Sequence, residues 1–525
     1  MSSQPEPRPY DVVLGGQSKK PQQLSLFETS PRAFDGVLGF VPSPYQRRIF
    51  DWIREEEGSC VVSAVPGSGK TTTLIKAAQQ HIKKGTSVRF LVFNQHIAQE
   101  LKSKLPKHIK AGTIHSLGYS ALFSFFRGQL EICSTKYTDL LIDLLRSKNI
   151  KLPPSMFKGI RQLIKFAQLT LTPVTPEALK ELALSYDLYA FEDWDFASYL
   201  VEQVLMTGLN YPTISYEDML WMPIKFGLSL SGYDFILVDE AQDLNRAQLE
   251  IVLKTHRAGS RGIFVGDENQ AILGFTASDY RSIKNICDRT GAIRLPLSIC
   301  YRCPTSHIEL ANKIHNVIES KPGAIEGEVY HIDSPEIPEV AKPGDLIICR
   351  CLYPVISVYY ELLKAGIPAK VKNQDISQQL LNLLEQLGGA TGVEYGEFSS
   401  TEFTDRLNHW FEVQRQDMLK SEVSLLRIFT LHDKVKCLIV MYEGNQCKSV
   451  VDLREAIERL SQDKRHTVVL TTIHGGKGLE AERVIFLKPQ LVPHPKATSD
   501  SELEQEQNLK FVALTRAKRV LYFAN

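Results

Sequence analysis

A glycine-rich segment, residues 64–71, constrains the fold of this chain more than any other feature of its sequence. It reads AVPGSGKT, follows the apolar run 59–64 and opens a helical pattern. In that setting glycines let the backbone approach a phosphate, and the amides of a helix N-terminus can bind it. The segment therefore predicts a phosphate-binding loop, with a plain glycine turn before a helix as the alternative. The candidate nucleotide-binding residues here are Pro66, Gly67, Ser68, Gly69, Lys70, Thr71 and Thr72.

Short apolar runs alternate with helical patterns along most of the chain. The runs that we expect to be buried strands lie at 59–64, 88–93, 235–238, 262–265, 345–349, 467–472, 484–487 and 520–523. Strands that alternate with helices are typical of parallel sheets covered by helices. Two long helix-rich stretches interrupt the alternation, and each reads as an insertion. The sequence thus predicts an α/β fold with two domains, each carrying a helix-rich insertion.

The run 235–238 ends at two acids, Asp239 and Glu240. In open α/β sheets, ligands bind at the carboxyl ends of the strands. Asp239 and the Thr71 hydroxyl are placed to hold Mg²⁺, and Glu240 is placed to orient or deprotonate a water molecule. A solvated strand end is the alternative. With Lys70 nearby, which we expect to reach the β- and γ-phosphates, the pair predicts nucleotide hydrolysis with Mg²⁺.

Composition excludes several classes of protein. The chain has 525 residues, 43% of them hydrophobic, and a formal net charge of +1. No apolar run approaches the roughly 18 residues of a membrane-spanning helix, and the N-terminus lacks the pattern of a secretory signal. Nine cysteines without a regular framework indicate a reducing compartment, so we expect a cytoplasmic protein. A membrane protein, a secreted disulfide scaffold and a fibrous protein are all disfavoured.

Charge is distributed unevenly although the net charge is small. Residues 102–165 contain 12 Lys and Arg against 3 Asp and Glu, a balance of +9, and residues 166–231 are acidic. A basic stretch can bind the phosphates of a nucleic acid. Solvated helix faces without a ligand are the alternative, and charge alone favours that alternative.

Residues 1–41 are rich in Pro, Gln, Ser and Gly and predict a disordered tail. Within it, residues 23–27 read QLSLF, a string that resembles the bacterial sliding-clamp-binding motif at every position. Such an apolar cluster in a polar tail can order on a partner. A chance cluster is the alternative. The candidate partner-binding residues are Gln23, Leu24, Leu26 and Phe27.

Further motifs follow the order found in one enzyme family. Residues 238–243 read VDEAQD and residues 265–275 read VGDENQAILGF. The others read YQ (45–46), FNQHIA (93–98), TIHSL (113–117), CYRC (300–303), TIHGGKGLE (472–480) and FVALTRA (511–517). This set resembles the superfamily 1 DNA helicases of the UvrD/Rep/PcrA type, and the amino-acid sequences of several motifs are similar to those of the branch near the F-box DNA helicases.

The resemblance implies two RecA-like P-loop domains. It places domain 1A at 42–116 and 233–297, interrupted by a helical insertion 1B at 117–232. It places domain 2A at 298–375 and 467–525, interrupted by insertion 2B at 376–466. This second insertion is much shorter than in UvrD or Rep, so we expect a reduced 2B.

The resemblance also implies roles at the nucleotide. Gln46 is implied to contact the adenine edge, Tyr301 to stack on the base, and Glu480 to belong to the nucleotide site. Two arginines are implied to act as fingers that reach the phosphates from the second domain. An ordinary surface ion pair is the alternative for either arginine. The candidate catalytic residues are Lys70, Asp239, Glu240, Gln270, Arg302 and Arg516.

For DNA, the resemblance implies base stacking at Phe93 and Phe275, a contact that does not depend on base identity. Core phenylalanines are the alternative for both. Thr113, His115 and His474 are candidate phosphate contacts. A lone histidine is more often structural, so that alternative stays open for the two histidines.

The sequence departs from the family pattern at two points. Leu273 and residues 276–278 stand where relatives have an aromatic residue and Arg-Gly-Ala, and Thr72 stands where relatives often have an adenine-contacting Arg.

The cysteine pairs at 300/303 and 349/351 have a spacing that metal sites use. We interpret these cysteines as thiols that bind no metal, because the first pair lies on a helicase motif.

These observations predict an ATP-dependent 3′→5′ single-stranded DNA translocase and DNA helicase that acts in DNA repair, replication or recombination. The substrates would be single-stranded and tailed duplex DNA, with a sliding clamp as a further partner. One alternative is a translocase that strips proteins from DNA without useful unwinding. Another is a clamp-tethered DNA-binding adaptor in which ATP only switches affinity.

Overall fold

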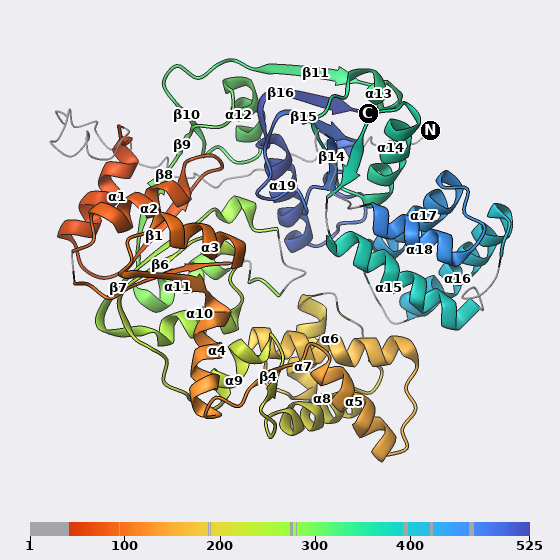
Figure 1. Cartoon of the computed structure of the whole chain (residues 1–525), viewed down its shortest axis with the longest axis horizontal. Helices are drawn as coiled ribbons and strands as arrows, with labels where there is room; N and C mark the ends of the chain where they lie inside the picture. The colour runs from red at the N-terminus through yellow and green to blue at the C-terminus, as the bar shows by residue number, and fades with distance from the viewer. Residues whose placement is uncertain are drawn as a thin grey trace, which may run out of the picture. The chain divides into compact units, whose positions relative to one another are not determined.

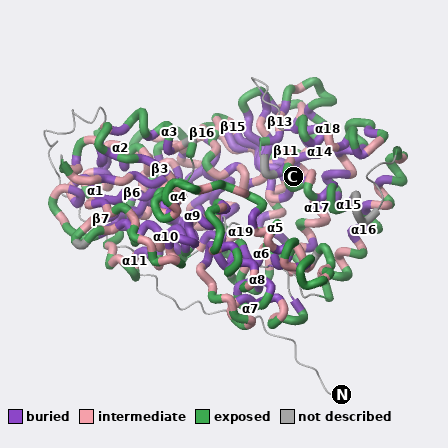
Figure 2. The backbone as a smooth tube through the Cα atoms, turned by 60° about the horizontal axis from the view of Figure 1, so that its bottom comes forward, coloured by how far each residue is buried: buried purple, intermediate pink, exposed green. Residues whose placement is uncertain are grey.

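Two six-stranded parallel sheets organise the chain in the computed structural model (Figure 1). The structure describes residues 41–525 except 84, 94, 187, 189–190, 273–276, 280, 373, 392–396, 421–423 and 461–466. Both sheets are flanked by helices, and buried residues run through the strands and the helices that cover them (Figure 2). The predicted α/β fold is confirmed.

The first sheet has the strand order β3-β2-β6-β7-β1-β8, and all its pairings are parallel. Its strands are β1 (Cys60–Ala64), β2 (Val88–Val92), β3 (Ile109–Thr113), β6 (Tyr233–Val238), β7 (His256–Gly266) and β8 (Ile293–Leu297). The accompanying helices are α1 (Pro44–Glu55), α2 (Lys70–Gln80), α3 (Gln95–Lys104), α10 (Arg246–Lys254) and α11 (Ser282–Thr290). We call this sheet, with its helices and its insert, the first lobe.

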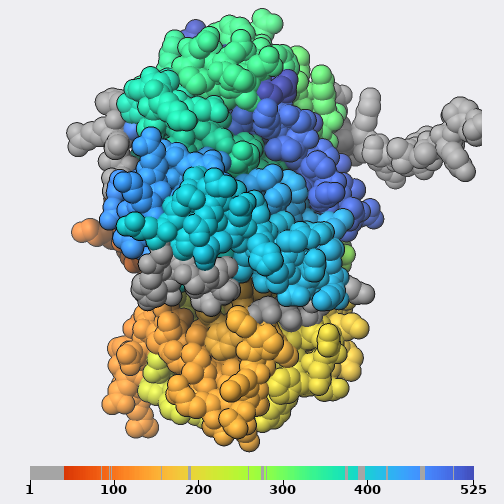
Figure 3. Space-filling view, turned by 90° about the vertical axis from the view of Figure 1, so that its right-hand side faces the viewer, coloured from red at the N-terminus to blue at the C-terminus, as the bar shows by residue number. Residues whose placement is uncertain are grey.

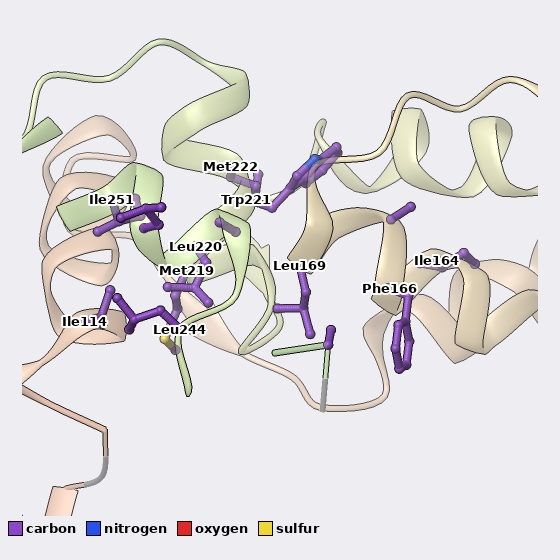
Figure 4. Close-up of a cluster of buried hydrophobic side chains, with 14 of the residues drawn as sticks. Ile114, Ile164, Phe166, Leu169, Met219, Leu220, Trp221, Met222, Leu244 and Ile251 are labelled. Atoms are coloured by element: carbon purple, nitrogen blue, oxygen red, sulfur yellow. The ribbon is translucent and has the colours of Figure 1, made fainter. Parts of the chain in front are cut away.

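A helical insert separates β3 from β6. It contains α4 (Ile114–Phe125), α5 (Lys136–Ser147), α6 (Pro154–Thr170), α7 (Pro176–Ser185), α8 (Trp194–Gly208), α9 (Asp218–Lys225) and the short pair β4 (Glu131–Ile132) and β5 (Thr213–Ile214). Its apolar side chains share one core with the first sheet, in which Ile114, Leu220 and Ile251 are buried (Figure 4). This first insert is therefore packed onto the sheet by a continuous hydrophobic cluster.

The second sheet has the order β11-β16-β15-β12-β14-β13, again parallel throughout. Its strands are β11 (Glu328–Ile332), β12 (Leu346–Cys349), β13 (Ala369–Val371), β14 (Val468–Thr472), β15 (Ala481–Leu487) and β16 (Ala517–Ala524). Around it lie α12 (Thr305–Asn312), α13 (Ile337–Val340), α14 (Leu352–Lys364), α19 (Asp500–Leu514) and the pair β9 (Ile299–Cys300) and β10 (Glu319–Ser320). These elements and the next insert form the second lobe.

The second insert, between β13 and β14, is helical as predicted. It contains α15 (Gln374–Thr391), α16 (Ser400–Lys420), α17 (Leu425–Gly444) and α18 (Val450–Arg459). Phe403, Val435 and Leu453 of this insert are fully buried in one cluster with Ile347 of β12. Figure 3 shows its surface in teal to blue. The domain boundaries given by the resemblance remain predictions.

All eight expected strands occur. Among the described residues the short pairs β4/β5 and β9/β10 were missed, and so were four strands of the two six-stranded sheets. These four strands are β3, β8, β11 and β13, which are the four edges of the two sheets. An edge strand is less buried than a central one, so it needs no continuous apolar run. In the part of the chain that the structure describes, no helix has the length and apolar character needed to cross a membrane.

Candidate nucleotide site and nucleic-acid groove

The phosphate loop lies between β1 and α2, where the sequence predicts it. Gly67 and Gly69 have φ of +68° and +78°, and Gly69 caps α2. A Cβ on Gly67 would lie 2.6 Å from Cβ of Arg302, which belongs to the loop after β9. Glycine is thus required at position 67 both for backbone conformation and for the close approach of the second lobe.

The acids that follow β6 face the phosphate loop. The Thr71 hydroxyl donates to Oδ2 of Asp239 at 2.7 Å, and Nζ of Lys70 lies 3.2 Å from Oε2 of Glu240. The backbone of Glu240 is in the left-handed region, at φ +53° and ψ +44°. Such a conformation costs about 1–3 kcal/mol in a non-glycine residue and is concentrated at functional sites. Here it turns the carboxylate toward Lys70.

Burial and neighbouring charges shift the pKa values of the two acids in opposite directions. Burial, reinforced by the carboxylate of Glu240, raises the pKa of Asp239 to about 6. Burial also acts on Glu240, but Lys70 and the Gln242 amide outweigh it and lower the pKa of Glu240 to about 2. Glu240 is therefore ionised at neutral pH.

The residues present fit Mg²⁺ bound with a nucleotide. Hydroxyl and carboxylate oxygens of Thr71 and Asp239 meet at one point, and Mg²⁺ prefers oxygen ligands of this kind. The Ser68 hydroxyl in the same loop is buried and has no hydrogen-bond partner among the described residues. A buried hydroxyl without a partner inside a phosphate loop is consistent with a ligand that supplies one.

The second lobe completes this site through Arg516, at the end of α19. Arg516 is buried, and its Nη2 donates to Oε1 of Gln270 at 3.0 Å. Gln270 ends the 3₁₀ turn η2 (Glu268–Gln270), and its own amide donates to Asp267 at 2.5 Å. Burial lowers the pKa of Arg516 to about 10, so the guanidinium stays charged at neutral pH.

Arg302 and Tyr301 lie beside the phosphate loop. Tyr301 is about half exposed, and its backbone N–H donates to the Gly67 carbonyl at 2.9 Å. Nε of Arg302 lies 2.5 Å from Oε2 of Glu480, which Lys518 also contacts at 2.7 Å. Arg302, Tyr301 and Glu480 thus come together at one side of the loop.

The other residues predicted for the nucleotide site are Gln46, Pro66 and Thr72. They lie in or near the phosphate loop, and their environments differ. Gln46 is buried, accepts from the Ser43 backbone N–H at 2.9 Å and donates to the Thr73 hydroxyl at 3.0 Å. Both ends of its amide therefore have protein partners in this structure. Pro66 is buried in the loop, and Thr72 is exposed on α2.

A groove lies beside the first insert, close to the carboxyl ends of β2 and β3. It is lined by Phe93, His115, Lys165, Leu169, Tyr216, Glu217, Asp243, Asn245, Gln248 and Ser278. Phe93 has 41% of its surface exposed, which contradicts the alternative of a core phenylalanine. Thr113 is the N-cap of α4, and its hydroxyl accepts from the Ser116 backbone at 3.3 Å. Phe275 lies outside the described residues.

The two candidate histidines are separated and uncharged. Burial lowers the pKa of His115 in the groove. His474 follows β14, and burial together with Arg350 and Lys477 lowers its pKa to about 3. Because both rings are neutral at pH 7, either can contact a phosphate only as a neutral hydrogen-bond donor. The predicted partner-binding residues 23–27 lie outside the described residues.

Sequence reasoning missed two features of these sites. Tyr216 is 57% exposed and Lys165 lies 3.5 Å from Glu217, and both line the groove with Phe93. Lys477 crosses between the lobes, and its Nζ lies 2.7 Å from both carboxylate oxygens of Asp243 and from the Gln270 carbonyl. Asp243 belongs to the motif at 238–243 and Lys477 to the motif at 472–480, but nothing in the sequence indicates that their side chains form an ion pair.

Comparisons with known proteins relate this chain to DNA helicases. Residues 46–290 match the family described as the UvrD/REP helicase N-terminal domain. F-box DNA helicase protein 1 of Schizosaccharomyces pombe is 21% identical over 560 residues, which cover 94% of this chain and 60% of that protein. The chain thus spans less than two thirds of that relative.

Two bacterial relatives are matched over most of their length. The ATP-dependent DNA helicase Rep of Buchnera aphidicola subsp. Schizaphis graminum is 20% identical over 607 residues, covering 89% of this chain and 91% of that protein. The ATP-dependent DNA helicase PcrA of Staphylococcus aureus is 23% identical over 606 residues, covering 90% of this chain and 82% of that protein.

Proposed function

We propose that this chain is an ATP-dependent DNA helicase, because residues 46–290 match the UvrD/REP helicase N-terminal domain and the relatives reported above are UvrD-like superfamily 1 helicases. One observation carries the proposal beyond similarity. Arg516 of the second lobe contacts Gln270 of the first at 3.0 Å, beside the Lys70–Glu240 pair. A site assembled from two lobes can couple hydrolysis to their relative movement.

At the nucleotide, Lys70 would bind the β- and γ-phosphates and Glu240 would orient the attacking water. Glu240 is suited to this role because its carboxylate is ionised at neutral pH. Gln270 would sense the γ-phosphate, and Arg302 and Arg516 would stabilise the charge on the transferred phosphoryl group. The Lys70–Glu240 ion pair would open when the phosphates enter.

Thr71 and Asp239 would hold Mg²⁺, which when bound neutralises charge on the β- and γ-phosphates. The backbone N–H groups of Gly67, Ser68 and Gly69 would donate to the same phosphates, Pro66 would shape the loop, and the Ser68 hydroxyl would gain the partner it lacks. Tyr301 would stack on the adenine, and Glu480 would lie beside it. For Gln46 to contact the adenine edge, its contact with Thr73 must open.

DNA would bind in the groove that contains Phe93. An exposed aromatic ring in a groove can stack on a base, and such stacking contributes about 1–3 kcal/mol per base. Thr113 and His115 lie at the start of α4, where neutral donors could meet a phosphate. We retain Phe275 and His474 as proposed contacts on the resemblance alone. Tyr216 and Lys165 extend this proposal to residues of the first insert.

We propose that opening and closing of the nucleotide site moves the protein 3′→5′ along single-stranded DNA and unwinds duplex ahead of it. DNA repair, replication or recombination would be the setting, in the cytoplasm, to which nine unpaired cysteines are suited. Residues Gln23, Leu24, Leu26 and Phe27 would tether the enzyme to a sliding clamp. Their replacement by Ala should abolish clamp pull-down and leave ATP hydrolysis intact.

Strand displacement on duplexes with a 3′ or a 5′ single-stranded tail tests the proposal. With ATP and Mg²⁺, we expect displacement from the 3′-tailed duplex only, and none with Lys70→Ala. Displacement from the 5′ tail would overturn the polarity. No DNA-stimulated ATP hydrolysis at all would exclude the helicase and leave the adaptor.

A translocase that strips proteins from DNA is the second candidate function. The short second insert favours it, because only four helices separate β13 from β14 among the described residues. DNA-stimulated hydrolysis and displacement of a protein block from single-stranded DNA, without strand displacement on either tailed duplex, would identify this activity.

A further inference from the structure

Cys300 and Cys303 form a pair of adjacent buried thiols next to the nucleotide site. Cys300 ends β9, and Cys303 precedes α12; they are 0% and 3% exposed. The backbone N–H of Cys303 donates to Sγ of Cys300 at 3.3 Å. Only Tyr301 and Arg302 separate them in sequence.

The pair is placed to act on the phosphate loop. A Cβ on Gly67 would lie 3.0 Å from Sγ of Cys300, so this sulfur packs against the loop itself. The Thr515 carbonyl accepts from Sγ of Cys303 at 3.5 Å and from Nη1 of Arg302 at 3.3 Å. A change at this pair therefore reaches both proposed arginine fingers, because Arg302 lies between the two cysteines and Arg516 follows Thr515.

The two sulfurs differ in reactivity. The neighbouring Cys303 side chain, backbone N–H groups and the charge of Arg302 lower the pKa of Cys300 to about 6, although burial opposes this. The neighbouring Cys300 side chain and burial raise the pKa of Cys303. A thiolate next to a neutral thiol is the arrangement of an attacking and a resolving cysteine.

We propose that Cys300 and Cys303 are a redox modification site, at which a hydroperoxide forms a disulfide that switches off nucleotide hydrolysis. The Cys300 thiolate attacks one oxygen of hydrogen peroxide, the O–O bond breaks, and with one proton the products are a sulfenic acid and water. Cys303 then attacks that sulfur, the S–O bond breaks, and its thiol proton leaves with the hydroxyl as a second water. Two thiols and one peroxide thus give one disulfide and two waters.

The disulfide would distort the site through the two residues that it encloses. An S–S bond of about 2.0 Å draws the two sulfurs toward each other and would pull Cys300 from Gly67 and Cys303 from Thr515. Tyr301 and Arg302 lie inside the new ring. A shift of about 1 Å at a catalytic group can reduce turnover about a hundredfold, and this is the loss that we expect.

A metal site is the competing use of these thiols. Among the residues that the structure describes, no three His, Cys, Asp or Glu side chains gather to hold a metal. The second pair in the chain, Cys349 and Cys351, provides a comparison. Burial raises the pKa of both, to about 12 for Cys351, so we expect that pair to stay reduced under mild oxidation.

The chemistry can be tested without measuring activity. Arg302 lies between the two cysteines, so trypsin cleaves the chain between them and yields the peptides 295–302 and 303–313. After hydrogen peroxide and then catalase, mass spectrometry of an unreduced digest should show these peptides linked, and dithiothreitol should release them. The number of free thiols in the denatured protein should fall by two from the nine of the reduced chain. Absence of the linked pair would overturn the proposal.

The regulatory effect rests on the proposed function and has its own readout. DNA-stimulated ATP hydrolysis should fall about a hundredfold on oxidation and recover with dithiothreitol. Cys300→Ser removes the thiolate that peroxide oxidises, so the activity of this variant, relative to its own untreated level, should resist peroxide. Cys351→Ser, the matched control, should remain sensitive. A linked peptide with unchanged hydrolysis would overturn the switch, whereas a reduced protein that hydrolyses no ATP would overturn the proposed function instead.

Discussion

At the scale of single residues, Gly67 determines how closely the two lobes can meet. Gly67→Ala would bring a Cβ within 2.6 Å of Arg302, and its φ of +68° adds backbone strain. We expect about a hundredfold loss of ATP hydrolysis, because Arg302 must move. Gly58 is the matched control, since it has φ +77° but open space around it.

Gly58→Ala should therefore show the strain alone, about 1–2 kcal/mol in the free energy of unfolding, with normal turnover. Denaturant unfolding and steady-state hydrolysis measure the two effects separately. Equal losses of activity in the two variants would show that the approach of Arg302 is unimportant.

Arg516 carries the second residue-scale prediction. Its guanidinium is buried and bound to Gln270, so it is positioned before any nucleotide enters. Arg516→Ala should reduce turnover about a thousandfold, the lower range for an arginine finger. Arg516→Lys keeps the charge without the planar fork and should recover only part of this loss. Both are followed by DNA-stimulated ATP hydrolysis.

Arg289 is the control for arginine removal. It pairs with Glu250 on the surface of the first lobe. Arg289→Ala should change stability by at most about 1 kcal/mol and leave turnover unchanged. If Arg516→Ala retained full turnover while folding normally, the two-lobe site would lose its main support.

At the scale of elements, central strands could be predicted and edge strands could not. β1 and β6 are buried apolar runs, CVVSA and YDFILV, which the sequence pattern reveals directly. β8 reads IRLPL and buries only Leu295 and Leu297, and β13 has only three residues. Edge strands form because a neighbour offers hydrogen bonds, and that information lies in the tertiary structure.

Helix α6 explains part of the basic stretch 102–165. Lys158, Arg161 and Lys165 lie on exposed positions at helical spacing, and Lys165 lines the groove. Lys158 is exposed as a whole, but neighbouring atoms partly desolvate it, and this desolvation together with the charges of Arg427 and Arg161 lowers its pKa. Cations that crowd one another in this way gain most from a polyanion. We therefore propose that α6 is the part of this basic stretch that faces DNA.

The double variant Lys158→Ala/Arg161→Ala should weaken single-stranded DNA binding at low salt. Loss of two phosphate contacts should reduce the slope of log affinity against log salt by about 1.4, at about 0.7 per contact. Fluorescence anisotropy over a salt series measures this slope. Arg146→Ala/Lys180→Ala removes the same charge from α5 and α7 of the first insert, and the slope should stay unchanged there. Equal effects of the two pairs would mean nonspecific attraction.

At the scale of the whole molecule, the site could be predicted from the sequence only in part. Lys70, Asp239 and Glu240 follow buried strands of one sheet, so local motifs place them together. Lys477 and Asp243 are 234 residues apart and meet only because the lobes pack together. A pair of this kind leaves no mark in motif spacing or periodicity, which is why sequence reasoning missed it.

That ion pair predicts how activity depends on pH. Burial raises the pKa of Asp243 to about 6, although Lys477 opposes the shift. Above pH 6 the carboxylate is ionised and holds Lys477; as the pH falls through about 6 it takes up a proton and the contact between the lobes weakens. Hydrolysis should therefore fall on the acidic side of pH 6, about tenfold per pH unit once Asp243 is mostly protonated.

Asp243→Asn and Lys477→Met test this assignment. Each single variant should lower ATP hydrolysis at pH 7. The double variant should be no less active than the less active of the two single variants, because both substitutions remove the same contact. Asp239 titrates in the same range in the free protein. The assays therefore use saturating Mg²⁺ and ATP, since a bound cation keeps that carboxylate ionised. Under those conditions the acidic limb should disappear in Asp243→Asn, and its persistence would assign the titration to another group.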